Sequence, residues 1–249
     1  MTLAERSIEL FLRRLLLRSN LSMEEQEAIR AVKGTEVTIP FRRDFVVPGR
    51  TVEHVSLVAE GVAARFDLMR DGRRAIAELF VPGDVCDLSS LVAPRAGWGL
   101  TALNGVHLVQ IPHANLRTLM KTHPEIEAAF WRDSAADAGV LAKLVGNMGR
   151  RDAKARVAHL FCEMGVRMEA TGIGTREHYA LNITQEQLGD VMGLTSVHVN
   201  RTLSALRDED AVSFHSHVVR VLDWERLTSI AEFDEAFLLL DQPENARLT

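Results

Sequence analysis

Residues 183–207 constrain the fold most, because they have the pattern of two short helices joined by a tight turn. Thr184 stands where an N-cap belongs, and Gln187 three residues later completes a capping box, so a helix begins here. Gly193 follows the last apolar residue of that helix and can take the left-handed conformation that turns the chain. Thr195 then provides a second N-cap. This order predicts a helix-turn-helix.

The second helix of this motif has one apolar and one polar face. Its apolar residues Val199, Leu203 and Leu206 recur at helical spacing and predict the buried side. The opposite face carries Ser196, Val197, Asn200, Arg201 and Ser204. A pair of ordinary core helices shows the same pattern, so the motif alone leaves that alternative open.

Two runs of β-type residues follow this helix. Residues 211–214 and 218–222 flank His215-Ser216-His217, which predicts a hairpin and hence a winged helix. The order of helix, turn, second helix with Asn200-Arg201, and hairpin resembles the DNA-binding domain of the CRP/FNR family of bacterial transcription regulators. The resemblance implies a β-roll and a long dimerisation helix upstream.

The chain changes in character between residues 36 and 111, where short β-type runs alternate with turn pairs such as Asn104-Gly105. Many short, closely spaced strands predict a sandwich or barrel. The predicted strands cover residues 37–39, 45–47, 55–58, 62–66, 75–80 and 106–111. Residues 34–120 resemble the cyclic-nucleotide-binding β-roll of the same family. This implies an α+β fold with a jelly-roll-like, double-stranded β-helix as sensor domain.

The phosphate-binding cassette of that β-roll is only partly matched. Residues 82–85, Pro-Gly-Asp-Val, match its start, but Leu88 stands where ligand-binding relatives have a glutamate, and Trp98 where they have an arginine. Neither can replace the polar contacts to a cyclic nucleotide. Arg95 would reach a phosphate only if the loop at 92–99 is rearranged. The N-terminal cysteines of an iron–sulfur cluster are absent too, so we expect neither cofactor, while another small effector stays open.

The resemblance divides the chain into four segments: 1–122 with N-terminal helices and the β-roll, 123–149 with the dimerisation helix, 150–223 with the winged helix-turn-helix domain, and 224–249 with a helical tail. The family's shorter members stop near the wing, so the tail is a departure, expected to pack on the body. Residues 1–33 are amphipathic, with a capping box at Ser22 and Glu25, and are expected to pack on the sensor domain. Contact of this basic helix with a membrane is the alternative.

The long helix begins at Pro124 and ends near the break at residues 149–151, after which Asp152 caps the next helix. Between a β-roll and a winged helix, its apolar stripe predicts a two-fold coiled-coil seam. The predicted dimer-interface residues are Ile126, Phe130, Val140, Leu141, Leu144 and Met148.

The resemblance also assigns roles in DNA binding. The base contacts fall on Ser196, Val197, Asn200 and Arg201, and Arg201 matches an arginine that pairs with guanine. Gln185, Thr195 and His198 are placed for phosphate contacts. The structural alternative for Arg201 is an ion pair with Asp208 or Glu209. The implied partners are double-stranded DNA with a palindromic operator, a second copy of the chain, and RNA polymerase.

Net charge, sequence motifs and cysteine content limit the possible functions and location of the protein. The net charge is −5, and residues 150–223 hold nine Lys or Arg against ten Asp or Glu, so specific binding depends on a few placed cations. No catalytic motif and no closely spaced metal ligands are visible, which argues against an enzyme. Two cysteines and no long apolar run predict a cytoplasmic protein without a membrane span. A sensor, nucleotide-binding or interaction module without DNA binding remains the alternative function.

Overall fold

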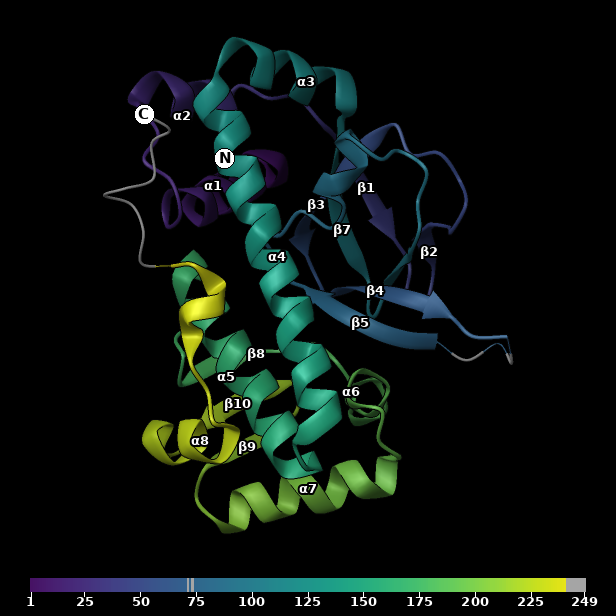
Figure 1. Cartoon of the computed structure of the whole chain (residues 1–249), viewed down its shortest axis with the longest axis vertical. Helices are drawn as coiled ribbons and strands as arrows, with labels where there is room; N and C mark the ends of the chain where they lie inside the picture. The colour runs from purple at the N-terminus through teal and green to yellow at the C-terminus, as the bar shows by residue number, and fades with distance from the viewer. Residues whose placement is uncertain (71, 73, 241–249) are drawn as a thin grey trace.

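The computed structural model describes residues 1–70, 72 and 74–240. Figure 1 shows a β-roll beside the upper half of a long helix, α4 (Pro124–Arg150), and a smaller domain packed around its lower half. Two helices precede the roll, α1 (Leu3–Leu16) and α2 (Met23–Arg30), and each starts with a capping box. The apolar face of α1 is buried, so this helix packs on the body as predicted.

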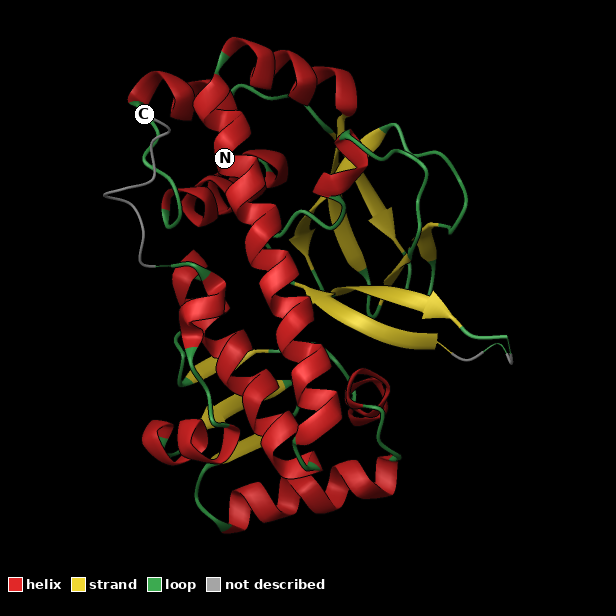
Figure 2. Ribbon diagram, viewed as in Figure 1, coloured by secondary structure: helices red, strands yellow, loops and turns green. Residues whose placement is uncertain are grey.

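The β-roll consists of two antiparallel sheets (Figure 2). One sheet has the order β1-β7-β3 and the other β2-β6-β4-β5. Their bounds are β1 (Thr35–Ile39), β2 (Asp44–Val46), β3 (His54–Glu60), β4 (Ala63–Leu68), β5 (Arg74–Phe80), β6 (Gly99–Ala102) and β7 (Val106–Pro112). All six predicted strands are present within about two residues. Strand β6 was not predicted, because it is short and begins with a glycine. A side chain at this glycine, Gly99, would collide with the Phe66 ring.

Helix α3 (His113–Thr122) leads into α4, and α5 (Ala153–Thr171) follows after a short break. Pro124 opens α4, as predicted. The break lies at Arg151, whose backbone is extended, and Asp152 caps α5 by accepting a hydrogen bond from the Ala155 amide at 2.8 Å. This junction is two residues long, so a small backbone change here would turn α5 relative to α4.

The smaller domain is a winged helix-turn-helix. It contains β8 (His178–Ala180), α6 (Gln185–Met192), α7 (Ser196–Asp208), β9 (Val212–His215) and β10 (Val218–Val221). Strand β8 ends at Ala180, because it pairs with only three residues of β10, from Val218 to Arg220. The tail contains α8 (Trp224–Ala231) and the 3-10 helix η2 (Glu235–Leu238); the rest of the predicted tail, 241–249, lies outside the described residues.

The hydrophobic core continues from one domain into the other. Residues of α5, α6 and α7 share one cluster with Val62, Ile76 and Leu79 of the β-roll. The Gln187 side chain, which completes the capping box of α6, also donates a 2.5 Å hydrogen bond to the carbonyl of Leu103. The winged domain is therefore packed against the roll as well as joined to it through α4 and α5.

A buried ionic cluster lies at the meeting point of α1, the roll, α4 and α5. Asp84, in the Pro-Gly-Asp-Val segment, accepts hydrogen bonds from Arg14 of α1 and Arg167 of α5. Burial opposes ionisation of this carboxyl, but Arg167 and Arg14 outweigh it and lower the pKa of Asp84. Further ion pairs join Arg14 to Asp133 and Asp137, Arg18 to Asp133, and Arg167 to Glu163. These charges tie four chain segments into one unit.

Candidate nucleic-acid interface

The helix-turn-helix has the local geometry that its sequence predicts. The Thr184 hydroxyl accepts from the Gln187 amide at 3.1 Å, and the Gln187 side chain accepts from the Thr184 amide at 2.7 Å. Gly193 ends α6 with φ +63°, in the left-handed region. Gly189 also matters, since a Cβ there would lie 2.7 Å from the Leu194 carbonyl oxygen. The close approach of the turn to α6 fixes the angle between the two helices.

Helix α7 buries one face and leaves the other open. Val199 and Leu206 are buried against α5 and α6, and Leu203 is partly buried. The four residues predicted to contact bases are all exposed, and Val197 is 72% exposed. In Figure 1, α7 lies at the lower end of the molecule, crossing the axis of α4. A partner can therefore reach this face without any change in the winged domain.

Two polar side chains on this face, Asn200 and Arg201, differ in whether they form hydrogen bonds or ion pairs with the described part of the chain. Asn200 donates from its amide nitrogen to the Ser196 carbonyl at 3.0 Å, which occupies one of its two amide hydrogens. Arg201 forms no ion pair or hydrogen bond within the described part of the chain. Asp208 instead approaches Arg207 at 3.8 Å, and Glu209 pairs with Lys154 at 2.7 Å. The expected structural alternative for Arg201 is thus not found among the described ion pairs.

A groove of about 510 Å³ runs beside the exposed face of α7. Val197, His198 and Arg201 line one side, and Asp152 and Lys154 from the start of α5 line the other. Lys154 was not predicted from the sequence. Its position in the sequence was a signal for this role. A lysine two residues after an N-cap lies beside the free backbone amides of the first helical turn, and the lysine and these amides both attract anions.

The three residues predicted to contact phosphate lie near the first turns of the two helices. Gln185 is the first residue of α6, and Thr195 caps α7 by accepting from the His198 amide at 3.3 Å. Thr195 and His198 are exposed, and Gln185 is partly exposed. Such positions place side chains and free amides at helix N-termini, where phosphates bind readily.

The wing is held to the start of the helix-turn-helix. Strands β8, β10 and β9 form one antiparallel sheet, and Ser216 and His217 at its tip both have positive φ. The His217 ring nitrogen Nδ1 lies 2.8 Å from the Ile183 carbonyl, and the Leu181 amide donates to the His217 carbonyl. The hairpin therefore has a defined position next to α6.

Three of the six predicted dimer-interface residues, Ile126, Phe130 and Val140, need correction. Ile126 and Phe130 are buried in the core formed with α1 and the roll, and Val140 is buried beneath the tail. Leu141 and Leu144 are only partly buried, and Met148 is 43% exposed although it borders a small cavity against α5, so these three stay predictions. The first three residues are not on the surface, because the stripe that the sequence shows is the one that packs within the protomer.

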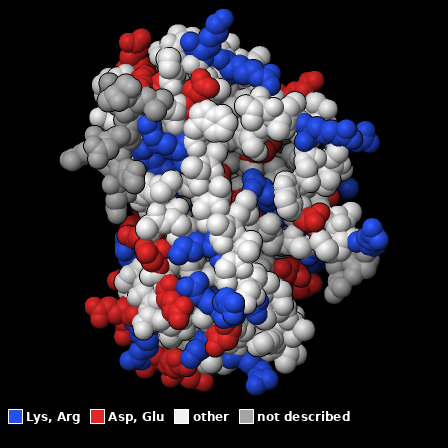
Figure 3. Space-filling model, in the orientation of Figure 1, with Lys and Arg blue, Asp and Glu red and all other residues white. Residues whose placement is uncertain are grey.

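A different face of α4 is uncovered. Its exposed residues follow a spacing of alternately four and three, and they are Trp131, Ala135, Ala138, Ala142, Val145 and Gly149. Trp131 is 57% and Val145 is 73% exposed. Figure 3 shows a largely uncharged band along the middle of the face where α4 runs, with mixed charges below it. An exposed apolar stripe at heptad spacing is the pattern of a two-helix seam.

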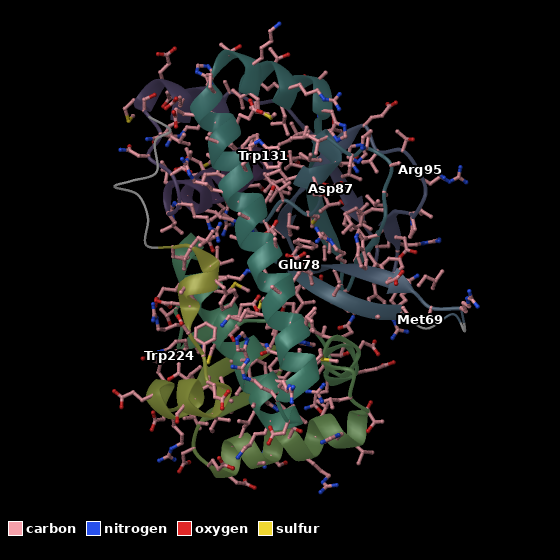
Figure 4. All side chains as sticks on the ribbon, in the orientation of Figure 1. Met69, Glu78, Asp87, Arg95, Trp131 and Trp224 are labelled. Carbon is pink, nitrogen blue, oxygen red and sulfur yellow. The ribbon has the colours of Figure 1, made fainter. Side chains whose placement is uncertain are left out.

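The β-roll contains a pocket of about 340 Å³. Leu88 does not line it, because its side chain is buried toward α4. Trp98 and Arg95 do line it, and both are exposed. The structure thus brings the arginine that the sequence places a few residues too early to the edge of the pocket. Figure 4 shows Arg95 toward the outer edge of the roll and Asp87 nearer α4.

Asp87 is the buried charge of this pocket. One carboxylate oxygen accepts from the Ser56 amide at 2.7 Å, and the other has no partner in the described structure. Burial raises the pKa of Asp87 to about 6. Arg65, also in the lining, is held by Glu78 at 2.8 Å and by the Cys86 carbonyl at 2.9 Å. A carboxyl group with one unpaired oxygen therefore lies in the wall of this pocket.

The remaining chemistry of the described residues is sparse. No group of three or more His, Cys, Asp or Glu side chains among them could hold a metal ion. Both cysteines are buried, and burial raises the pKa of Cys86 and Cys162. Among the described helices, none is long and apolar enough to cross a membrane.

Comparison with known sequences gives consistent results. Residues 155–230 match the Crp-like helix-turn-helix domain. The nitrogen fixation regulation protein FixK of Azorhizobium caulinodans is 26% identical over 186 residues, which cover 75% of this chain and 74% of FixK. The cAMP-activated global transcriptional regulator CRP of Salmonella typhimurium is 21% identical over 185 residues, covering 73% and 87% of the two chains.

The solved structures support the fold. FixK2 from Bradyrhizobium japonicum superimposes with a TM-score of 0.71 at 24% identity, covering 80% of this chain and 98% of FixK2. This coverage and TM-score confirm the predicted fold. Residues 155–230 are therefore a Crp-like helix-turn-helix domain, and the chain as a whole is similar in sequence and fold to transcription regulators of the CRP/FNR family.

Proposed function

We propose that the protein is a homodimeric, sequence-specific regulator that places α7 of each protomer in the major groove of a palindromic site. The observation that carries this proposal is the exposed face of α7, where Arg201 has no partner among the described residues. A guanidinium without a competing ion pair can donate two hydrogen bonds to guanine O6 and N7. RNA polymerase is the further partner that regulation of transcription implies.

The other residues of this face have distinct roles. Val197 can offer only apolar contact, for instance to a thymine methyl group, and Asn200 can still donate one amide hydrogen and accept at its oxygen. Ser196 can donate or accept. Gln185, Thr195 and His198 would bind phosphates and set the register, with Lys154 added on the opposite side of the groove.

The dimer forms through the exposed stripe of α4 defined above. Alanines and a glycine at most of its positions allow two helices to approach closely, while Trp131 and Val145 provide apolar area near its ends. A two-fold axis along α4 would place the α7 helices of both protomers on the same side of the dimer. Half-sites about one helical turn apart, roughly 34 Å, are the spacing expected for such a dimer.

We do not propose cyclic AMP as effector. The buried Asp87 carboxylate opposes a phosphate, and Leu88 points away from the pocket. Titration calorimetry with cyclic AMP should show no binding at micromolar concentrations, and saturable heat in that range would contradict this part of the proposal. A different small molecule or control through protein abundance is compatible with the same fold.

The test of the proposed function is retention of duplex DNA at rising salt by the wild-type chain and by an Asn200→Asp, Arg201→Glu double variant. Both positions are exposed, so the variant should fold normally, as circular dichroism would check. The two new carboxylates should abolish sequence-specific retention, since they repel phosphates and cannot bond guanine. Val47→Asp, an exposed substitution on the β-roll, is the control. Equal retention by all three proteins would show that α7 does not read DNA.

A further inference from the structure

Residues 232–240, called the tail segment from here on, run from the junction between α4 and α5 to the middle of α4. Figure 1 shows this part of the chain in yellow, rising from α8 alongside α5 and α4. At the junction, Arg151 donates to the Glu232 carbonyl at 3.0 Å and approaches the Glu232 carboxylate at 3.4 Å. The junction residue itself is thus bound to the tail segment.

The tail segment contacts α4 at close range. Leu238 is only 1% exposed and packs with Val140 of α4 and Val166 of α5. The Lys143 ammonium group lies 5.3 Å from the centre of the Phe237 ring. The Phe237 backbone rests against Gly139, where the absence of a side chain makes room for it. One turn of η2 is therefore seated on the middle of α4.

The same segment also holds α5 and α1. The His159 ring of α5 lies 5.1 Å from the Phe233 ring and 5.8 Å from the Phe237 ring. Arg18, after the end of α1, donates from Nε to the Leu238 carbonyl at 2.9 Å in a buried hydrogen bond. Displacement of the tail segment would open this aromatic cluster and leave the Arg18 donor without its acceptor.

The angle between α4 and α5 determines where α7 lies relative to the face of α4 that we assign to the dimer. We propose that the tail segment fixes this angle and thereby determines which half-site spacing the dimer accepts. Gly139 and Phe237 are then positioning residues for DNA recognition, although neither touches DNA. This inference rests on the proposed function.

Gly139 offers a way to displace the tail segment without changing it. A Cβ at this position would lie 2.7 Å from the Phe237 carbonyl oxygen, so Gly139→Ala forces the backbone of η2 away from α4. Gly146 is in the same helix and has nothing within 4 Å of an added Cβ, which makes Gly146→Ala the matched control. Both substitutions raise helix propensity by a similar amount.

The first measurement needs no DNA. Fluorophores on Lys121→Cys of α3 and Arg207→Cys of α7, both exposed positions, report the distance across the junction, and the two native cysteines are buried. Labelled protein is diluted into a large excess of unlabelled protein, so that each dimer carries one labelled protomer. We expect a narrow energy-transfer distribution for wild type and Gly146→Ala. Gly139→Ala and a chain that ends after Asp234 should give a broad one, and a narrow distribution for both would overturn the inference.

The second measurement compares affinity for palindromes whose half-sites are at the preferred spacing or moved by one base pair. Gly139→Ala should lose about tenfold in affinity at the preferred spacing and change less than about twofold at the altered one, because the binding-competent orientation becomes a minor population. Preference for individual bases should remain, which a general loss of folding would not give. Unchanged spacing preference, or tighter binding by Gly139→Ala, would overturn the inference alone. A wild-type chain that binds no duplex would overturn the proposed function with it.

Discussion

At the scale of single residues, Arg201 carries the most specific prediction. Arg201→Ala should weaken binding to the preferred site by about 1–3 kcal/mol and relax the preference at one base pair of each half-site. Arg207→Ala, an exposed arginine farther along the same helix, is the matched control and should leave that preference intact. Binding to duplexes with each half-site base changed in turn checks both. If Arg201→Ala weakens all sequences equally, the arginine contacts phosphate and not guanine.

His159 gives a prediction about pH. Burial, followed by the nearby charges of Arg151 and Lys143, lowers the pKa of His159 to about 4, and neither ring nitrogen has a partner in the described structure. In the unfolded chain His159 takes up a proton near pH 6.5, whereas in the folded chain it does so only near pH 4. The free energy of unfolding therefore falls as the pH drops from about 6.5 to 4. Above that range this histidine contributes no pH dependence.

Replacement with an apolar ring should remove this acid sensitivity. Relative to wild type, His159→Phe should reduce the loss of unfolding free energy between pH 6.5 and 4 by about 2–3 kcal/mol. Chemical denaturation at a series of pH values measures the difference. Parallel pH profiles for the two proteins would mean that His159 is accessible to protons in the folded chain.

The residues whose roles could be predicted from the sequence contact near neighbours along the chain. Those whose roles could not be predicted contact residues far away in the sequence. The capping roles of Thr184, Gln187 and Gly193 depend on neighbours a few residues away, so these roles could be predicted from the sequence. Asp84 was interpreted as part of a phosphate cassette, yet its partners are Arg14 and Arg167, both about 70 residues or more away. A buried charge pair at such separation leaves no local pattern.

At the scale of elements, helix α4 shows where periodicity succeeds and fails. The sequence predicted its start, its length and its role as the longest helix, because these depend on Pro124 and on the spacing of apolar residues. It did not reveal which of two apolar faces is the inner one. Ile126 and Phe130 pack into the core with α1 and the roll, whereas the exposed face carries mostly alanine together with Trp131 and Val145.

The exposed face of α4 is tested by Val145→Asp. This valine is 73% exposed in the protomer, so the substitution should leave the protomer's fold intact while placing two carboxylates at the seam of the proposed dimer. We expect a shift from dimer to monomer at micromolar concentration and weaker binding to a palindrome. Sedimentation velocity measures the shift, and Val47→Asp on the β-roll is the control. A Val145→Asp protein that stays dimeric would place the interface elsewhere.

At the scale of the whole molecule, the two domains are joined by a shared core and by buried charges. Val62, Ile76 and Leu79 of the roll pack with the winged domain, and Asp84 links α1 to α5. The fold class and the order of the domains were predicted from sequence, whereas this contact between the domains was not. This contact forms between side chains of separate domains, so the spacing of apolar residues within either domain does not predict it.

Removal of the Asp84 charge should therefore affect the whole molecule. Asp84→Asn leaves Arg14 and Arg167 each without one carboxylate, and breaking a buried ion pair costs about 3–5 kcal/mol. Asp67→Asn, at an exposed position of β4, is the matched control and should be nearly neutral. Thermal unfolding compares the two. A melting temperature for Asp84→Asn equal to that of Asp67→Asn would show that the cluster contributes little.

The central claim is that a dimer reads DNA through α7. Selection of bound duplexes from a pool of random sequence, followed by sequencing, tests it most directly. We expect enrichment of a two-fold symmetric sequence with half-site centres about one helical turn apart and with a guanine that loses its enrichment when the selection is repeated with Arg201→Ala. Recovery of unenriched sequences, or of a single asymmetric half-site by a protein that remains monomeric, would contradict the claim.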